Sequence, residues 1–246
     1  MFVNAHPHYV YFFQYRGKMH PFKIIATGIF SALSVIFASN IATAELMNLR
    51  VTSASMMPAF GPGDVVAATS YKPEEKIERG DLVAYKVHFV SKLPPFPDTT
   101  VDAIFLGRVI GLPNETVEIE DGIPLINGIA LETTTIKSTI DGGCPEEAEA
   151  STYLQCRFVR EATPEGKSYV LLDLRNDSVG DNIDPKALGP HEYYIMGDNR
   201  DNANDSRFKN VGLISIDSIR GKVRMISASV RKPDRQWRLE GFPGLE

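Results

Sequence analysis

The feature that most constrains this chain is an uncharged run of 21 residues, 24–44, which reads IIATGIFSALSVIFASNIATA. A helix needs about 20 apolar residues to cross the hydrocarbon core of a bilayer. The run is apolar on every side, so it does not suit the surface of a water-soluble domain. It therefore predicts a transmembrane helix. A buried core helix is one alternative, and a signal peptide cleaved after the small-x-small triplet 42–44 is another.

The charges that precede the run indicate its orientation. Arg16, Lys18 and Lys23 lie before it, and basic residues next to a membrane span stay on the cytoplasmic side. We therefore expect a cytoplasmic segment over 1–23, a single-pass anchor over 24–44 in the cell (inner) membrane, and an extracytoplasmic or periplasmic remainder. The net charge of −5 offers no basic face, so a nucleic-acid partner is not expected.

Short β-branched runs separated by turn residues fill the chain beyond the anchor, which contains many of its 19 glycines and 16 prolines. This pattern is typical of an all-β domain, and the lack of strand–helix alternation disfavours a parallel sheet. Asp121-Gly122 and Asn127-Gly128 are turn dipeptides that predict a hairpin over 116–131. The prediction is a mainly β protein: a transmembrane helix, an antiparallel β-sheet domain over 45–232, and a tail over 233–246. The strands expected outside the hairpin are 65–71, 82–87, 104–112, 167–174, 192–198 and a closing strand before 227.

Three segments are expected to lack strands: a connection over 45–60, a proline-rich loop over 88–103, and a loop-rich insertion over about 133–167. The insertion holds the two cysteines, Cys144 and Cys156. No histidine lies near either, so a zinc site is not expected, and we expect no other metal and no cofactor. We prefer a disulfide, which requires an oxidising compartment; two unrelated buried thiols are the alternative.

Four segments carry a stronger signal when they are read together: SASMMPAF at 53–60, RGDLVAYK at 79–86, GRVIGLP at 107–113 and GDNRDNANDSR at 197–207. In this order and spacing they resemble type I signal peptidases, the membrane-bound serine endopeptidases that remove signal peptides from exported proteins. The resemblance covers about 50–226, and it extends to the anchor, the exported β domain and a disulfide in the insertion. It implies preprotein signal peptides as substrates, with small residues at the first and third positions before the cut, and contact with membrane lipid.

The resemblance also implies roles for individual residues. Ser55 corresponds to the nucleophile, and Ser53 with the Ser55 backbone N–H corresponds to the groups that bind the oxyanion. Each preorganised donor of this kind stabilises the transition state by about 3 kcal/mol. By themselves these residues could equally form an ordinary turn with solvated ion pairs, worth about 0–1 kcal/mol each. The remaining matches support the site, by shaping the Ser55 turn or by forming ion pairs: Met56 and Pro58, Arg108 with Asp198, and Asp205 with Arg207.

Two positions depart from the family's pattern. The family's general base is a buried lysine, and the matching residue here is Gly107. The serine that orients that lysine is matched by Ala203. The general base is therefore unknown, and four hypotheses follow. Another group supplies it; water deprotonates Ser55 slowly; the protein binds without cutting; or an unknown partner protein completes the site. The nearby candidates in sequence for a replacement base are Lys86, His88 and Lys92.

The predicted function is that of a signal peptidase I-like serine endopeptidase that removes N-terminal signal peptides after small residues. One alternative is a catalytically impaired relative that binds such segments without cutting them. Another is a peptidase that matures pilin or conjugation proteins with the same chemistry.

Overall fold

The computed structural model describes residues 45–72, 74–91, 98–136, 157–229 and 237–238. No helix in these ranges is long and apolar enough to span a membrane. The expected anchor at 24–44, the disulfide between Cys144 and Cys156, and Lys92 all lie outside the described residues.

An eight-stranded sheet forms the larger part of the domain, in the order β1-β2-β14-β3-β4-β12-β13, with β15 paired to β14. Its strands are β1 (Leu46–Arg50), β2 (Val65–Thr69), β3 (Leu82–Ser91), β4 (Thr99–Gly111), β12 (Glu192–Met196), β13 (Ile214–Ser215), β14 (Ile219–Ala228) and β15 (Trp237–Arg238).

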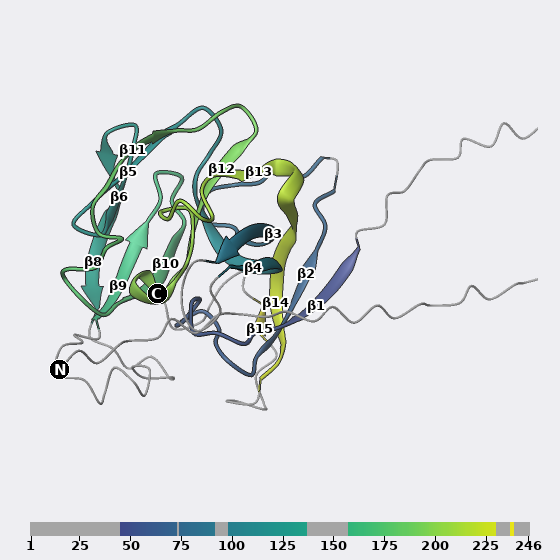
Figure 1. Ribbon diagram of the computed structural model, residues 1–246. Coiled ribbons are helices and arrows are strands. Elements are labelled where there is room, and N and C mark those ends of the chain that lie inside the picture. Colours follow the sequence, from purple (N-terminus) through teal and green to yellow (C-terminus); the bar gives the residue numbers. More distant parts are fainter. Residues whose placement is uncertain (1–44, 73, 92–97, 137–156, 230–236, 239–246) are drawn as a thin grey trace, which may run out of the picture.

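Two smaller sheets lie together on the other side of the molecule, on the left in Figure 1. One has the order β11-β5-β6-β7 and the other, which we call the insertion sheet, has the order β10-β9-β8. Their strands are β5 (Thr116–Glu120), β6 (Ile123–Ile126), β7 (Ile129–Ala130), β8 (Glu132–Ile136), β9 (Arg157–Ala162), β10 (Ser168–Asp173) and β11 (Ile183–Ala187).

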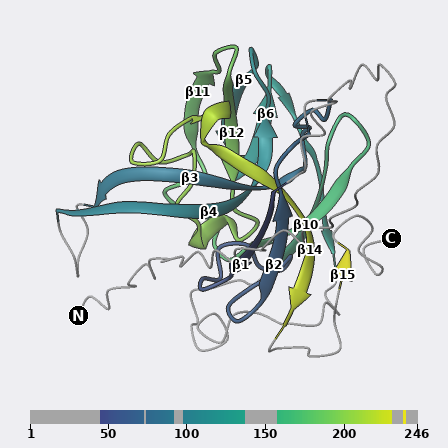
Figure 2. The ribbon, with the colours of Figure 1, turned by 90° about the vertical axis from the view of Figure 1, so that its right-hand side faces the viewer.

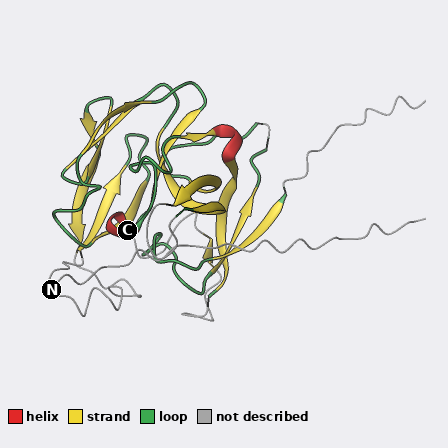
Figure 3. Ribbon diagram, viewed as in Figure 1, coloured by secondary structure: helices red, strands yellow, loops and turns green. Residues whose placement is uncertain are grey.

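Every strand pair within these sheets is antiparallel, which confirms the predicted antiparallel β class for the described residues. The helices in the described ranges are the short 3₁₀ turns η1 (Arg200–Asn202) and η2 (Ile216–Ser218), shown red in Figure 3. Asp121, Gly122, Asn127 and Gly128 all have positive φ, as two-residue hairpin turns require.

Strands also form in each of the three segments that were expected to lack them. β1 lies in the expected connection and pairs with β2 along its whole length. β3 and β4 extend into the expected loop, because their ladder continues to the pair Ser91–Thr99, and they form the long hairpin in Figure 2. β8 and β9 pair with each other within the expected insertion. In all three cases the stabilising partner is another strand, which local composition does not reveal.

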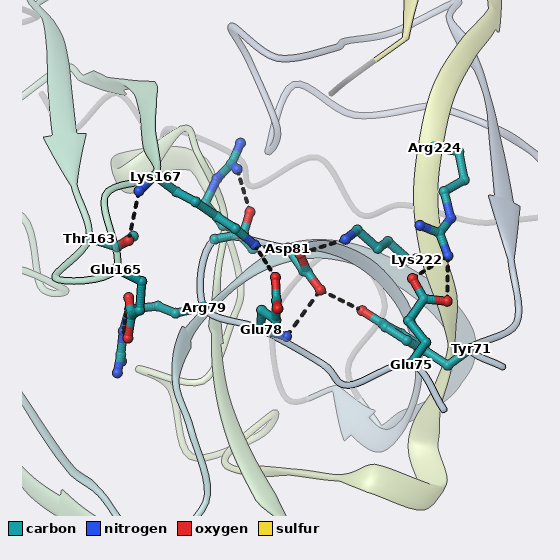
Figure 4. A network of polar contacts seen from close by, with 12 residues as sticks. Tyr71, Glu75, Glu78, Arg79, Asp81, Thr163, Glu165, Lys167, Lys222 and Arg224 are labelled. Carbon is teal, nitrogen blue, oxygen red and sulfur yellow. Dashed lines mark hydrogen bonds and ion pairs between the residues drawn. The ribbon is translucent and has the colours of Figure 1, made fainter. Parts of the chain in front are cut away.

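A polar cluster joins the main sheet to the insertion sheet (Figure 4). Asp81, buried at the start of β3, pairs with Lys222 of β14 at 2.9 Å and with Lys167 at 3.2 Å. The neighbouring Arg79 is buried and reaches Glu165 at 3.2 Å. Lys167 and Glu165 lie in the turn between β9 and β10. The RGD part of the second motif therefore fixes the insertion sheet against the main sheet.

Candidate active site

The Ser53–Ser55 turn presents two hydroxyl groups to each other. Their Oγ atoms are 3.0 Å apart, and the Ser55 backbone N–H donates to Ser53 Oγ at 3.4 Å. Both serines are partly exposed, so a ligand can reach them. The Ser53 hydroxyl thus lies beside both the proposed nucleophile and the backbone donor of the proposed oxyanion site.

The residues after Ser55 are buried against two different sheets. Met56 and Phe60 belong to a cluster that includes Leu82 and Leu106 of the main sheet. Met57 instead packs in a cluster with Leu172 and other side chains of the insertion sheet. The turn that carries Ser55 is therefore held between these two sheets.

The 197–207 loop holds the other side of the turn through backbone contacts. Asn199 donates from its backbone N–H to the Ser55 carbonyl at 3.0 Å and from Nδ2 to the Ala54 carbonyl at 3.1 Å. A Cβ atom on Gly197 would lie 2.7 Å from the Ser55 carbonyl oxygen and would overlap the Cβ of Ala203. The close approach of the loop to Ser55 therefore requires glycine at 197.

A buried ion pair supports Gly197. Arg207 donates to both carboxylate oxygens of Asp205, from Nε at 2.9 Å and from a terminal nitrogen at 2.8 Å. The same carboxylate accepts the Gly197 backbone N–H at 3.0 Å. Asp205 and Arg207 therefore brace the part of the loop that touches Ser55.

A second buried pair joins this loop to β4. Arg108 binds Asp198 with two hydrogen bonds of 2.7 and 2.6 Å, and both residues are almost fully buried. Burial alone would lower the pKa of Arg108, but the charge and hydrogen bonds of Asp198 outweigh it and raise that pKa above its ordinary value. This bidentate geometry fixes Asp198, and hence the start of the loop, relative to the main sheet.

Side chains already fill the space beside Gly107. A Cβ atom there would lie 2.5 Å from Ile195 Cγ2, 3.2 Å from Tyr85 Cε1 and 3.3 Å from the Met196 carbonyl oxygen. Tyr85 is 1% exposed, and burial, with a smaller contribution from the Asp205 charge, raises the pKa of its phenol. The position that matches the family's lysine is therefore apolar and closely packed around glycine.

Among the described residues, no lysine or histidine lies within hydrogen-bonding distance of Ser55. The Ser55 hydroxyl contacts the Ser53 hydroxyl instead. Lys86 instead pairs with Asp102 at 3.1 Å, with both side chains about half exposed. His88 is exposed on β3. No group of three or more metal-ligating side chains occurs among the described residues.

The family model described as "Signal peptidase, peptidase S26" matches residues 24–228, which is most of the chain. The chain belongs to this signal peptidase family. The match includes the Ser53–Ser55 turn, the Gly107–Arg108 pair and the whole 197–207 loop described above.

Two relatives from Rickettsia illustrate the similarity. The chain is 29% identical over 161 residues to signal peptidase I of Rickettsia bellii (strain OSU 85-389), a match that covers 63% of this chain and 48% of the relative. It is 28% identical over 161 residues to signal peptidase I of Rickettsia felis, covering 63% and 53% respectively. The chain thus spans about half the length of the curated relatives it matches.

Among solved structures, a signal peptidase I of Enterococcus faecalis V583 matches 60% of this chain and 97% of its own, at 22% identity. Its TM-score is 0.30.

Several residues at the site were not predicted from the sequence. Asn199 and Arg200 lie inside the fourth motif. Near its start, the residues Asp-Asn-Arg indicate a polar turn and no individual role for either residue. Glu161 lies in the segment expected to be a loop, and FVREA shows no alternation of apolar and polar residues that could have drawn attention to it. Tyr85 and Ile195 look like ordinary strand residues, and their relation to Gly107 becomes visible only in three dimensions.

Proposed function

We propose that this protein is a signal peptidase I-like serine endopeptidase that cuts preproteins after small residues, with Ser55 as the nucleophile. In this proposal 24–44 anchors the chain in the membrane, and the β domain over 45–232 lies outside the cytoplasm. A disulfide between Cys144 and Cys156 closes the insertion. Its substrates are preprotein signal peptides, which the site meets next to membrane lipid.

One observation carries the proposal: the hydroxyl groups of Ser53 and Ser55 lie 3.0 Å apart on a turn whose backbone is fixed by Asn199. A tetrahedral intermediate formed on Ser55 would place its oxyanion near the Ser55 N–H and the Ser53 hydroxyl. A substrate peptide lying beside this turn in extended form would expose its carbonyl to Ser55. Because no basic side chain contacts Ser55 in the described residues, water would accept the proton that the Ser55 hydroxyl loses on attack. Turnover should then be lower by about 10²–10⁴-fold than in a site with a positioned base.

A second candidate function is binding of signal-peptide-like segments without cleavage. The packing at Gly107 favours it, because Ile195 and Tyr85 leave no room for a basic side chain at that position. In this case the Ser53–Ser55 turn serves only to recognise peptides.

Cleavage and binding measured on the same purified full-length chain distinguish the two functions. The substrate is a preprotein with alanine at the first and third positions before the cut, in detergent or reconstituted vesicles. The variants are Ser55→Ala and, as a matched control, Ser168→Ala, which changes an exposed serine on β10.

We expect slow cleavage by the wild type and by Ser168→Ala, and none by Ser55→Ala. Equal cleavage by Ser55→Ala would contradict the nucleophile assignment. Saturable binding with no cleavage by any variant would support the second function. If the protein neither binds nor cleaves the substrate, both functions are refuted. Pilin precursors tested in parallel would show whether those are the preferred substrates.

A further inference from the structure

The segment 198–201 links the Ser55 turn to the insertion sheet. On one side, Asn199 makes the two hydrogen bonds to the Ala54 and Ser55 carbonyls. On the other side, the Asp198 carbonyl accepts the Leu172 backbone N–H of β10 at 2.8 Å. The Asp201 carboxylate accepts the backbone N–H groups of Leu174 and Arg175, at 2.6 and 3.0 Å, just beyond β10. The part of the loop that holds Ser55 is thus itself held by the insertion sheet.

A buried ion pair provides the strongest of these links. Glu161 of β9 is completely buried and accepts two hydrogen bonds from Arg200, at 2.7 and 3.0 Å. Arg200 is 5% exposed, and the one other acceptor of its guanidinium among the described residues is the Gly122 carbonyl at 3.4 Å. The Arg200 Nε has no partner in the same part of the chain. Glu161 is therefore the counter-charge on which the buried position of Arg200 depends.

Tyr169 connects this pair to the second ion pair of the site. Its hydroxyl donates to Glu161 at 2.5 Å, and the guanidinium of Arg108 lies 4.0 Å from the centre of its ring. Arg108 in turn binds Asp198, the first residue of the linking segment. The insertion sheet therefore holds that segment at two residues, at Arg200 directly and at Asp198 by way of the Tyr169 ring and Arg108.

The pKa of Arg200 is shifted in the direction that pairing with Glu161 predicts. Burial would lower the pKa of Arg200, yet the charge and hydrogen bonds of Glu161 reverse this and raise that pKa above its ordinary value. Removing one partner of a buried ion pair leaves an uncompensated buried charge, which is strongly destabilising. An unpaired Arg200 would move toward water, and the adjacent Asn199 would move with it.

We propose that Glu161 is a positioning residue for Ser55: by fixing Arg200, it keeps Asn199 bonded to the Ala54 and Ser55 carbonyls. The proposal depends on the proposed function of Ser55, because positioning matters only if that hydroxyl acts on a peptide. It assigns the insertion sheet a role in the site, although none of its residues is required to touch substrate.

The test compares Glu161→Gln with Glu165→Gln in the full chain. Glu165 is a matched control, since it also pairs with a buried arginine outside the insertion, Arg79, but its own side chain is 47% exposed. We expect Glu161→Gln to lower kcat by about 10²-fold with little change in KM, as for an active-site misplacement of about 1 Å. Glu165→Gln should leave kcat unchanged, and Glu161→Asp, which keeps the charge, should recover part of the loss.

A second readout does not require catalysis. Ser55→Cys introduces a thiol whose alkylation rate, followed by peptide mass spectrometry, reports the environment at position 55. We expect Glu161→Gln to change this rate several-fold and Glu165→Gln to leave it unchanged. This measurement still tests the proposal if the wild type proves unable to cleave, so failure of the proposed function and failure of the positioning role are distinguishable.

Unchanged alkylation and unchanged kcat in a folded Glu161→Gln variant would overturn the proposal and leave Glu161 as a structural residue of the insertion. If that variant does not fold, Glu161→Leu with Arg200→Met removes both buried charges together, an exchange that is often neutral for stability. The folded double variant should then show the same loss in kcat and the same change in alkylation. Wild-type values for both would refute the positioning role.

Discussion

The packing around Gly107 allows a quantitative prediction for Gly107→Ala. The added Cβ would lie 2.5 Å from Ile195 Cγ2 and 3.2 Å from Tyr85 Cε1, both closer than an ordinary carbon–carbon contact. Forcing one methyl group into a close-packed core costs about 1–3 kcal/mol. Replacing glycine by alanine restores about 0.4–1 kcal/mol by restricting the unfolded chain. The clash is the larger effect, so the variant should lose roughly 1–2 kcal/mol of unfolding free energy.

Ile195→Ala provides the control, because it removes the atom that the new Cβ meets. By itself it should cost about 2–5 kcal/mol as a large-to-small change in a core. In the double variant the new methyl group enters space that the isoleucine vacated. The double variant should therefore be more stable than the sum of the two single effects by about 1–3 kcal/mol, within the range of couplings between touching residues.

Urea unfolding of the four proteins, followed by circular dichroism, measures this coupling. Additivity within about 0.5 kcal/mol would mean that Ile195 does not restrict position 107, and the reasoning from packing would be wrong.

The packing around Gly107 also leads to a prediction about catalysis. Gly107→Lys with Ala203→Ser should add Ser55-dependent turnover only when Ile195→Ala accompanies them, whereas a gain without that change would also contradict the packing argument.

Two further predictions follow from the structure. Gly197→Ala should destabilise the loop and abolish Ser55-dependent cleavage, because the new Cβ would lie 2.7 Å from the Ser55 carbonyl oxygen, a backbone atom that cannot rotate away. The control is Gly189→Ala, whose new Cβ would meet only the flexible Glu192 side chain. Wild-type cleavage by Gly197→Ala would count against the contact. Burial raises the pKa values of Tyr85, Tyr169 and Tyr194 above the ordinary 10.0, so their contribution to stability is complete below pH 10 and is lost as pH rises beyond it, when the unfolded chain ionises first. Above pH 10, each of these three tyrosines should lower the unfolding free energy by about 1.4 kcal/mol per pH unit. Urea unfolding measured on either side of pH 10 tests this, and an unfolding free energy that stays constant above pH 10 would contradict it.

The parts of the fold that could be predicted from the sequence are those whose cause is local. The turns at Asp121-Gly122 and Asn127-Gly128 follow from dipeptides that tolerate positive φ. β2, β10 and β12 follow from short apolar runs bounded by turn residues. β1 could not be predicted in this way, because LMNLR is a mixed and largely exposed segment that becomes a strand by pairing with β2.

The candidate site likewise has a part that could be predicted from local sequence and a part that depends on distant residues. The motifs located the Ser53–Ser55 turn and the 197–207 loop, since their residues are contiguous in the chain. The dependence of that loop on Glu161 could not be seen, because a lone glutamate in a polar segment carries no sign of its distant arginine. The filling of the space at Gly107 was hidden for a similar reason: it arises where β3, β4 and β12 meet side by side.

The hydrogen bond from Asn199 to the Ala54 carbonyl joins residues 145 positions apart. Contacts of such long sequence separation form late in folding, because a large loop must close, at a cost in chain entropy, before the contact can stabilise the structure. A growing or truncated chain that ends before Asn199 therefore has the serines but lacks the support that shapes their turn. If the proposed function holds, a chain that emerges with its N-terminal end first would order its nucleophile only after Asn199 has also emerged.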